Sequence, residues 1–208
     1  MARESVIKKI TTGIGVVEGY VCVVEPSTKF NPEGEYNIQV VVPNKEGIAL
    51  AKTMINMQDM QYDKYRKNSK KVEITAVKPY VKVEKDENGR IIKEIPDPEG
   101  RYIIKAKNKA YIKNGVVGQK IPIFDSKLNP MNGVKFGAGS KVRLGLTLEG
   151  YSTNLGTGVS VKLRMVQVLE MASFGGYKAD DFFTETEGYE FDADSAETVD
   201  IEDEEADF

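Results

Sequence analysis

The sequence of 208 residues predicts a mainly β protein, built as a compact antiparallel barrel with one inserted helix and an acidic C-terminal tail. Three observations support this class. Short segments rich in β-branched side chains are separated by Gly, Pro and Asn turn signals, a single stretch favours helix formers, and the final segment is acidic with few aliphatic side chains. The expected domains are therefore a barrel over residues 1–178 and a disordered tail over residues 179–208.

The N-terminal part carries two predicted strands and the helix. The strands cover residues 14–24 and 36–42, and the second stops at the turn signal Pro43-Asn44. The helix covers residues 45–67, where helix formers replace β-branched residues. Its apolar stripe, which Gln58 interrupts, is expected to consist of Ile48, Ala51, Ile55 and Tyr62. Packing rather than a site is expected for Met54, Met57 and Met60.

The remaining strands are short and separated by turns. They are expected over residues 72–84, 90–95, 101–113, 121–124, 141–151 and 159–170. The Asn88-Gly89 pair predicts the turn between the first two of them. Residues 137–141 contain glycines as a phosphate-binding loop does, but they lack Gly-Lys-Ser/Thr and precede a strand rather than a helix. We therefore expect a hairpin turn there.

The composition excludes several classes of protein. The chain has no histidine, so mechanisms that need an imidazole base or metal ligand are excluded. Its single cysteine, Cys22, rules out an intramolecular disulfide and an all-cysteine zinc site, and its apolar neighbours predict a buried strand position. No apolar run approaches the roughly 20 residues of a membrane-spanning helix, and no signal core follows the N-terminus. A cytoplasmic protein without cofactor, metal or membrane contact is expected.

The charges divide into two opposed parts. Lys and Arg number 29 and Asp and Glu 32, but residues 179–208 contain 14 of the acids and neither Lys nor Arg. Residues 1–178 therefore carry a net charge of +11 and the tail −14. Such a tail is expected to be attracted to the basic body and to compete there with other polyanions, although a terminal acidic run can also serve solubility alone.

The predicted strands place cations on one face. Because successive strand residues point to opposite sides, the alternate positions form an apolar inner side and a basic outer side. Inward positions include Val142, Leu144, Leu146 and Leu148, and also Val159, Val161, Leu163, Met165 and Leu169. The outward cations and tyrosines proposed as binding residues are Lys105, Lys107, Lys109 and Tyr111; Lys141, Arg143 and Tyr151; Lys162 and Arg164; and Tyr80 and Lys82.

This outer face predicts a surface for single-stranded nucleic acid. Lysine can simply solvate the exposed face of a sheet, but four strands with almost no acids on that face are unusual for a surface that serves solubility alone. Cations follow phosphates, and unpaired bases stack on flat aromatic rings. A duplex hides its base faces and would not use the tyrosines in this way.

With these features assembled, the chain resembles the OB-fold single-stranded DNA-binding proteins of short-tailed lytic bacteriophages. The resemblance covers roughly residues 8–50 and 121–208, whereas residues 51–120 match only in outline. It rests on short motifs that occur in the family's order: Gly15 to Tyr20, Glu25-Pro26, Asn31-Pro32-x-Gly34-x-Tyr36, Val42-Pro43-Asn44-Lys45, Asp125-Ser126-Lys127, Gly137-x-Gly139-Ser140-Lys141, Tyr151 leading into Gly158 to Leu163, Ala172-x-Phe174-Gly175-Gly176, and a final Asp-Phe.

The resemblance implies a five-stranded OB-fold barrel and a non-enzymatic replication protein, commonly a homodimer. Such a protein coats single-stranded DNA, promotes annealing, takes part in recombination and repair, and acts in the cytoplasm of the infected bacterium. The family's DNA-contacting tyrosine falls on Tyr151, its Lys-x-Tyr pair on Lys109 and Tyr111, and its N-terminal basic contact on Lys8 or Lys9. Glu33 stands where the family can carry a basic contact, which is either absent here or moved to Lys29.

The resemblance also assigns a role to the tail. It implies that the tail recruits the replicative DNA polymerase and the helicase-primase. The residues expected to make these contacts are Asp203, Glu204, Glu205, Asp207 and Phe208, with Phe208 as the terminal aromatic anchor. The alternative is an acidic-tailed interaction or scaffold protein whose basic face pairs with its own tail or with a protein partner rather than with DNA.

Overall fold

The computed structural model describes residues 6–65 and 70–172, all within one compact unit, Met1–Gly176. Two predictions therefore lie outside the described residues: the tail over residues 179–208 with its domain boundary, and the last turn of the helix at residues 66–67.

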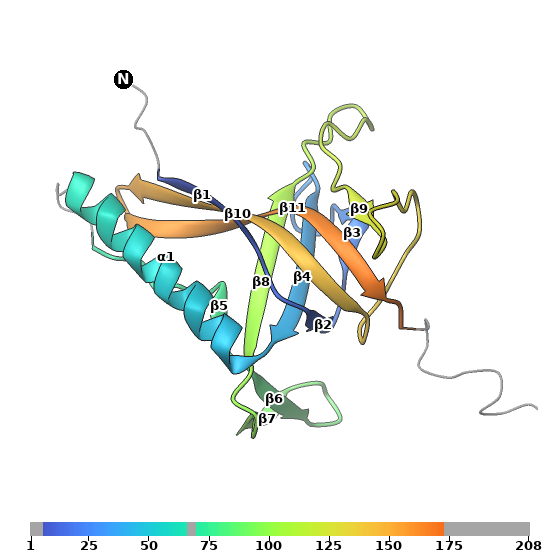
Figure 1. Ribbon diagram of the computed structural model, residues 1–208, viewed down its shortest axis with the longest axis horizontal. Helices are drawn as coiled ribbons and strands as arrows, with labels where there is room; N and C mark the ends of the chain where they lie inside the picture. Colours follow the sequence, from blue (N-terminus) through green and yellow to red (C-terminus); the bar gives the residue numbers. More distant parts are fainter. Residues whose placement is uncertain (1–5, 66–69, 173–208) are drawn as a thin grey trace, which may run out of the picture. The chain divides into compact units, whose positions relative to one another are not determined.

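Five strands close into a ring and form the barrel (Figure 1). They are β2 (Gly15–Val17), β4 (Glu35–Val42), β8 (Tyr102–Lys109), β10 (Lys141–Thr153) and β11 (Gly156–Glu170). Around the ring, β10 pairs with β2, β2 with β4, β4 with β8, β8 with β11, and β11 with β10. The predicted five-stranded barrel is thus confirmed. Its pairs are antiparallel except β8–β11, which is parallel and meets at Lys107 and Lys162.

Shorter strands extend the ring. The strand β1 (Ile7–Thr11) pairs with β10, β3 (Cys22–Ser27) with β4, β5 (Val77–Pro79) with β8, and β9 (Ile123–Phe124) with β11. A separate hairpin consists of β6 (Val81–Lys85) and β7 (Ile91–Pro96), joined across the predicted Asn88-Gly89 turn. In Figure 1 this hairpin lies at the end of the barrel where β8 begins.

Three predicted strands are shorter than expected because the backbone turns within them. The strand predicted over residues 14–24 divides into β2 and β3 around Gly19, whose φ is +68°. The one predicted over 72–84 divides into β5, which joins the barrel, and β6, which does not. The one predicted over 101–113 ends at Lys109, shortly before Tyr111, whose φ of 54° is left-handed and departs from extended strand backbone.

The inner faces of the strands form the core, as their alternation predicts. Val142, Leu144 and Leu148 have no exposed surface, nor do Ile38 and Val40 of β4, which belong to the same core cluster. Cys22 is buried in β3, where its Sγ accepts a bond from the Asn37 amide at 3.6 Å, so the predicted packing role is confirmed.

The alternation fails in the second half of β11. Met165 was expected inside but is 47% exposed, whereas Val166 and Val168 are buried. The pairing shows why: Gly145 faces Met165 but the next residue, Leu146, faces Leu163, so β11 has one extra residue at this point. Such a β-bulge reverses the sides on which the following side chains, Met165 to Val168, lie.

The helix α1 (Asn44–Tyr65) packs on β5, β8, β10 and β11, but with a different face from the predicted one. Its buried side chains are Leu50, Met54, Met57, Gln58 and Gln61, whereas Ile55 and Met60 are exposed. The two glutamines are buried because they bond to distant segments. The Gln58 amide donates to the carbonyls of Val72 at 2.6 Å and Thr157 at 2.9 Å, and Gln61 accepts from the Val6 amide at 3.3 Å.

Candidate nucleic-acid interface

A groove runs over the outer faces of β8 and β11, and we call it the central groove. It has a volume of about 500 Å³. Its cations and rings are Lys105, Lys107, Lys109, Tyr111, Tyr151 and Lys162, and its other lining residues include Val159 and Val161. Six residues that the sequence singled out on three strands therefore lie together, because the parallel β8–β11 pair closes the barrel beneath them.

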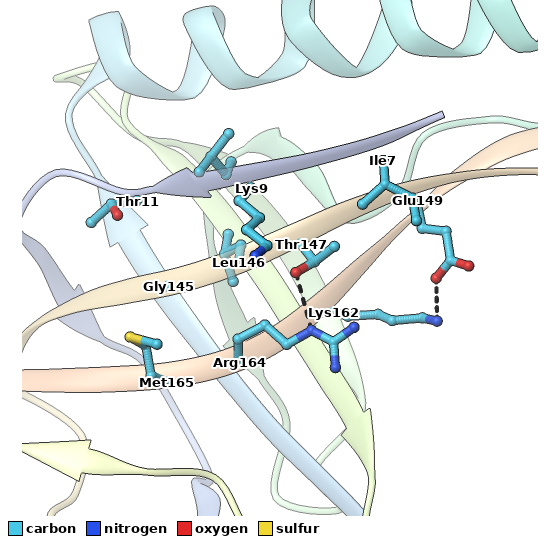
Figure 2. A pocket seen from close by; sticks show the side chains of 11 residues that line it. Ile7, Lys9, Thr11, Gly145, Leu146, Thr147, Glu149, Lys162, Arg164 and Met165 are labelled. Atoms are coloured by element: carbon cyan, nitrogen blue, oxygen red, sulfur yellow. Dashed lines mark hydrogen bonds and ion pairs between the residues drawn. The ribbon is translucent and has the colours of Figure 1, made fainter. Parts of the chain in front are cut away.

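A second groove lies on the outer faces of β1, β10 and β11, and we call it the adjoining groove. Its volume is about 770 Å³, and it contains Lys9, Lys162 and Arg164 beside the apolar side chains of Ile7 and Met165. Figure 2 shows Lys9 of β1 and Arg164 of β11 with Thr147 of β10. Because Lys162 lines both grooves, the two form one basic path over the barrel.

The β10–β11 hairpin fixes the position of Tyr151. Tyr151 lies opposite Gly158, and its ring occupies the space where a side chain at that position would begin. A Cβ built on Gly158 would lie 2.4 Å from the Tyr151 Oη and 2.5 Å from its Cζ. The glycine therefore allows the ring to lie across the neighbouring strand, in the groove.

Tyr111 lies just beyond the end of β8. Its side chain is 54% exposed, and the Lys109 Nζ is 6.0 Å from its ring centroid. The left-handed backbone at Tyr111 ends the strand but leaves the ring at the groove. The central groove thus has two tyrosines with cations between them.

The expectation that the basic face holds almost no acids is wrong. The Lys107 Nζ lies 2.8 Å from a Glu35 carboxylate oxygen, and the Lys109 Nζ lies 3.2 Å from Glu33. Lys162 is ion-paired with Glu149, as the dashed line in Figure 2 shows. Glu33 precedes β4, Glu35 lies on β4, and Glu149 lies on β10. Only the register in which these strands pair with β8 and β11 reveals that the three acids reach the basic face.

Other groove cations have no carboxylate partner within residues 6–65 and 70–172. They are Lys9, Lys105 and Arg164. Arg164 is held by a bond from its Nε to the Thr147 hydroxyl at 3.0 Å, which leaves its terminal nitrogens directed away from that bond. These three cations are available to an anionic ligand.

The structure does not bring the other proposed residues into the grooves. Lys141 and Arg143 lie at the start of β10, where Lys141 is ion-paired with Glu170 at 2.6 Å. Lys8 lies opposite Leu148, on the other face of β1 from Lys9. Lys82 lies on β6, and Tyr80 lies just before that strand, where its amide donates to the carbonyl of Arg101 at the start of β8, the end opposite to Tyr111.

Tyr80 already has partners of its own. Its ring centroid lies 5.8 Å from the Arg101 Cζ, and its pKa is raised, chiefly by burial and then by Glu18. Arg101 donates to both carboxylate oxygens of Asp97, at 3.0 and 2.7 Å. These bonds lower the pKa of Asp97 from 3.8 to about 2.

Sequence reasoning missed two residues near the central groove. Phe30 is 90% exposed, with the Lys29 Nζ 5.4 Å from its ring centroid. Its loop is tied to the residues around Tyr111, because the Ile112 amide donates to the Glu33 carbonyl at 2.8 Å. An aromatic beside an Asn-Pro turn was the available signal. Asn108 of β8 also lines the groove; it is buried, and its Nδ2 has no hydrogen-bond partner among the described residues.

The described residues show neither a cluster of metal ligands nor a helix suited to span a membrane. Within residues 6–65 and 70–172, no group of three or more His, Cys, Asp or Glu side chains is placed to hold a metal ion. In the same part of the chain, no helix is both long enough and apolar enough to cross a membrane.

No protein-family model matches the chain. It is 28% identical to the single-stranded DNA-binding protein of Escherichia phage T7 over 204 residues, which cover 86% of this chain and 83% of that protein.

Solved structures show the same fold. The crystal structure of gp2.5, a single-stranded DNA-binding protein encoded by bacteriophage T7, has a TM-score of 0.58 at 21% identity and covers 90% of this chain and 100% of that one. The single-stranded DNA-binding protein of bacteriophage Enc34 in complex with single-stranded DNA has a TM-score of 0.52 at 14% identity, covering 80% of this chain and 89% of that one. The predicted resemblance is thus confirmed: the chain is similar in sequence and in fold to the OB-fold single-stranded DNA-binding proteins of bacteriophages.

Proposed function

We propose that this protein binds single-stranded DNA during bacteriophage DNA replication and that it is not an enzyme. The observation that carries the proposal is the central groove, where Tyr111 and Tyr151 lie among lysines of two adjacent strands. Lysines attract the phosphates of a strand, and each base that stacks on a ring contributes about 1–3 kcal/mol. A groove with both is suited to a strand whose bases are unpaired.

The path of the strand follows from the two grooves. Beginning at Tyr111, it passes Tyr151 and Lys162 and continues into the adjoining groove toward Arg164 and Lys9. Among the described residues no tyrosine lines the adjoining groove; there the cations bind phosphates while the apolar residues contact bases or sugars. Lys8, Lys82, Lys141 and Arg143 then contribute to the long-range field rather than to direct contacts.

The decisive experiment is a titration with oligo-dT of graded length at several salt concentrations. Binding that neutralises Z phosphates of a single strand gives a slope of about −0.7Z in a plot of log affinity against log salt. We expect a steep negative slope and a preference for oligo-dT over duplex. Weak salt dependence, or tighter binding of duplex, would contradict the proposal.

Further roles come from the resemblance rather than from the groove. We propose that the protein coats and protects single strands and promotes their annealing. Recombination and repair, a homodimeric state and action in the cytoplasm of the infected bacterium belong to the same proposal.

We propose in addition that the acidic segment 179–208 competes with DNA for the basic body and recruits the replicative polymerase and the helicase-primase. The charges of +11 and −14 support the competition. Deleting residues 179–208 should raise oligo-dT affinity at low salt, whereas removing Phe208 should spare DNA binding and weaken capture of the polymerase. Unchanged affinity after the deletion would contradict the competition.

A second candidate is an interaction protein whose basic face binds an acidic protein. The groove lysines already hold carboxylates of this chain, so they could hold those of a partner. Such a protein would show no stoichiometric binding to oligo-dT, so the same titration separates the two candidates.

A further inference from the structure

Three of the four lysines that line the central groove already have a carboxylate beside them. The pairs are Lys107–Glu35 at 2.8 Å, Lys109–Glu33 at 3.2 Å, and Lys162–Glu149. The lysine side chains of the first two pairs are 62% and 55% exposed, so water and ions reach them. Ion pairs this exposed contribute little to folding stability and break readily.

The three acids come from different segments of the chain, and each lies beside one lysine of the central groove. Glu33 precedes β4, Glu35 begins it, and Glu149 lies on β10 opposite Ser160. Glu35 is directly opposite Lys109 in the β4–β8 register, and its carboxylate reaches Lys107, two residues earlier on β8. The rings of Tyr111 and Tyr151 remain available to bases whether or not the lysines are paired.

We infer that Glu33, Glu35 and Glu149 are built-in competitors of DNA for Lys107, Lys109 and Lys162, and that they hasten release of the bound strand. The inference rests on the proposed function. A phosphate that enters the groove replaces a carboxylate on the same ammonium group. When one phosphate detaches, the neighbouring carboxylate can take the lysine back, so the strand leaves in small steps.

This exchange has a signature in the salt dependence. In the native protein, a displaced glutamate keeps its charge close to the DNA and takes up a cation, which offsets a counterion that the DNA releases. Without the three glutamates, Lys107, Lys109 and Lys162 increase the number of phosphates that the protein neutralises with net release of a counterion. The log–log slope should then become steeper by about two, since each phosphate contributes about 0.7.

The experiment compares two triple variants of the full chain. The groove variant is Glu33→Gln, Glu35→Gln and Glu149→Gln. The matched control is Glu25→Gln, Glu99→Gln and Glu170→Gln, which removes the same charge from three ion-paired glutamates that line neither groove. Dissociation of labelled oligo-dT is followed by stopped-flow fluorescence after a chase with unlabelled oligo-dT.

We expect the groove variant to release oligo-dT roughly tenfold more slowly at low salt, a change within the range that three exposed ion pairs can contribute together. Its plot of log affinity against log salt should also have the steeper slope. The control should change by less than about twofold. Release at the native rate or faster would overturn the inference, because the glutamates would then only position the lysines. An equal change in both variants would also overturn it, by showing an effect of net charge alone.

Two safeguards keep the outcome clear. If the triple variant fails to fold, Glu33→Gln with Glu35→Gln gives the same test on the two most exposed pairs. If the native protein itself does not bind oligo-dT, the proposed function fails. If it binds and the variants leave the release rate unchanged, only the present inference fails.

Discussion

Two Lys-x-Tyr segments lie near opposite ends of β8, and they differ in what surrounds them. Lys109 and Tyr111 lie in the central groove, and the Tyr111 ring is 54% exposed. Lys78 and Tyr80 lie at the other end, where the half-buried Tyr80 ring packs against Arg101. In the sequence the two segments look alike, because each has a lysine two residues before a tyrosine. The structure shows that only the first belongs to a groove with a second tyrosine, so the surroundings rather than the residue types distinguish a binding site from a structural contact.

The largest expected effect comes from removing both rings of the groove. The double variant Tyr111→Ala, Tyr151→Ala should bind oligo-dT at least roughly 30-fold more weakly, because each stacked base contributes about 1–3 kcal/mol. Fluorescence anisotropy with labelled oligo-dT measures this. Tyr80→Ala is the control and should stay within about twofold of the native affinity. A loss with Tyr80→Ala as large as that of the double variant would erase the distinction between the two segments.

A smaller effect tests how Tyr151 is positioned. Gly158→Ala introduces a Cβ where the ring now lies, 2.5 Å from the Tyr151 Cζ, so the ring must move. We expect oligo-dT affinity to fall roughly tenfold, up to the loss of one stacked base.

Gly137→Ala is the matched control for that change, because a Cβ there meets no atom of the described residues within 4 Å. Native affinity in Gly158→Ala would show that the resting position of the Tyr151 ring is not the binding position.

Phe30 extends the comparison to a third ring. Its exposed side chain lies in the loop bonded to the residues around Tyr111. Phe30→Ala should lower oligo-dT affinity by about fivefold, at the low end of the range for one stacked base. Ile92→Ala removes an exposed apolar side chain from the β6–β7 hairpin and should leave affinity unchanged. If both changes act equally, Phe30 has no role specific to the groove.

At the end of β8 where Tyr80 lies, pH should change the contribution to folding stability but not the affinity for oligo-dT. Arg101 holds the pKa of Asp97 at about 2, below its ordinary 3.8. A lowered folded-state pKa means that the unfolded chain binds more protons between these values. Asp97 therefore stabilises the fold fully above about pH 4, and this contribution is lost as the pH falls toward 2.

Asp97→Asn is expected to lower the denaturation midpoint at pH 7 and to differ less from the native protein near pH 2, with oligo-dT affinity unchanged. Urea titrations at both pH values measure it. A difference in stability that grows toward pH 2 would contradict the assignment of Asp97 as a carboxylate held ionised by Arg101.

The barrel and its core could be predicted because strand alternation is local. β10 buries Val142, Leu144, Leu146 and Leu148, which the alternation assigned to the inner side, although Thr147 on its outer side is buried as well. The prediction failed where the cause lies elsewhere in the fold. Met165 is exposed because of a bulge opposite Gly145 and Leu146, and Gln58 is buried because the carbonyls of Val72 and Thr157 accept its amide.

The candidate site was predictable in its residue types but not in its electrostatics. The lysines and tyrosines of β8, β10 and β11 follow from alternation, and the parallel β8–β11 contact gathers them. The carboxylates beside them do not follow, because Glu33 and Glu35 lie about seventy residues from the lysines they pair with. Only the register of β4 on β8 brings these glutamates and lysines together.

The most direct test of the account is to find which tyrosine contacts a bound strand. Oligo-dT that carries 5-iododeoxyuridine, irradiated with the full-length protein and mapped by mass spectrometry, should form cross-links at Tyr111 and Tyr151 and none at Tyr80. Cross-links at Tyr80, or binding without a cross-link at either groove tyrosine, would contradict the claim that the central groove holds the DNA.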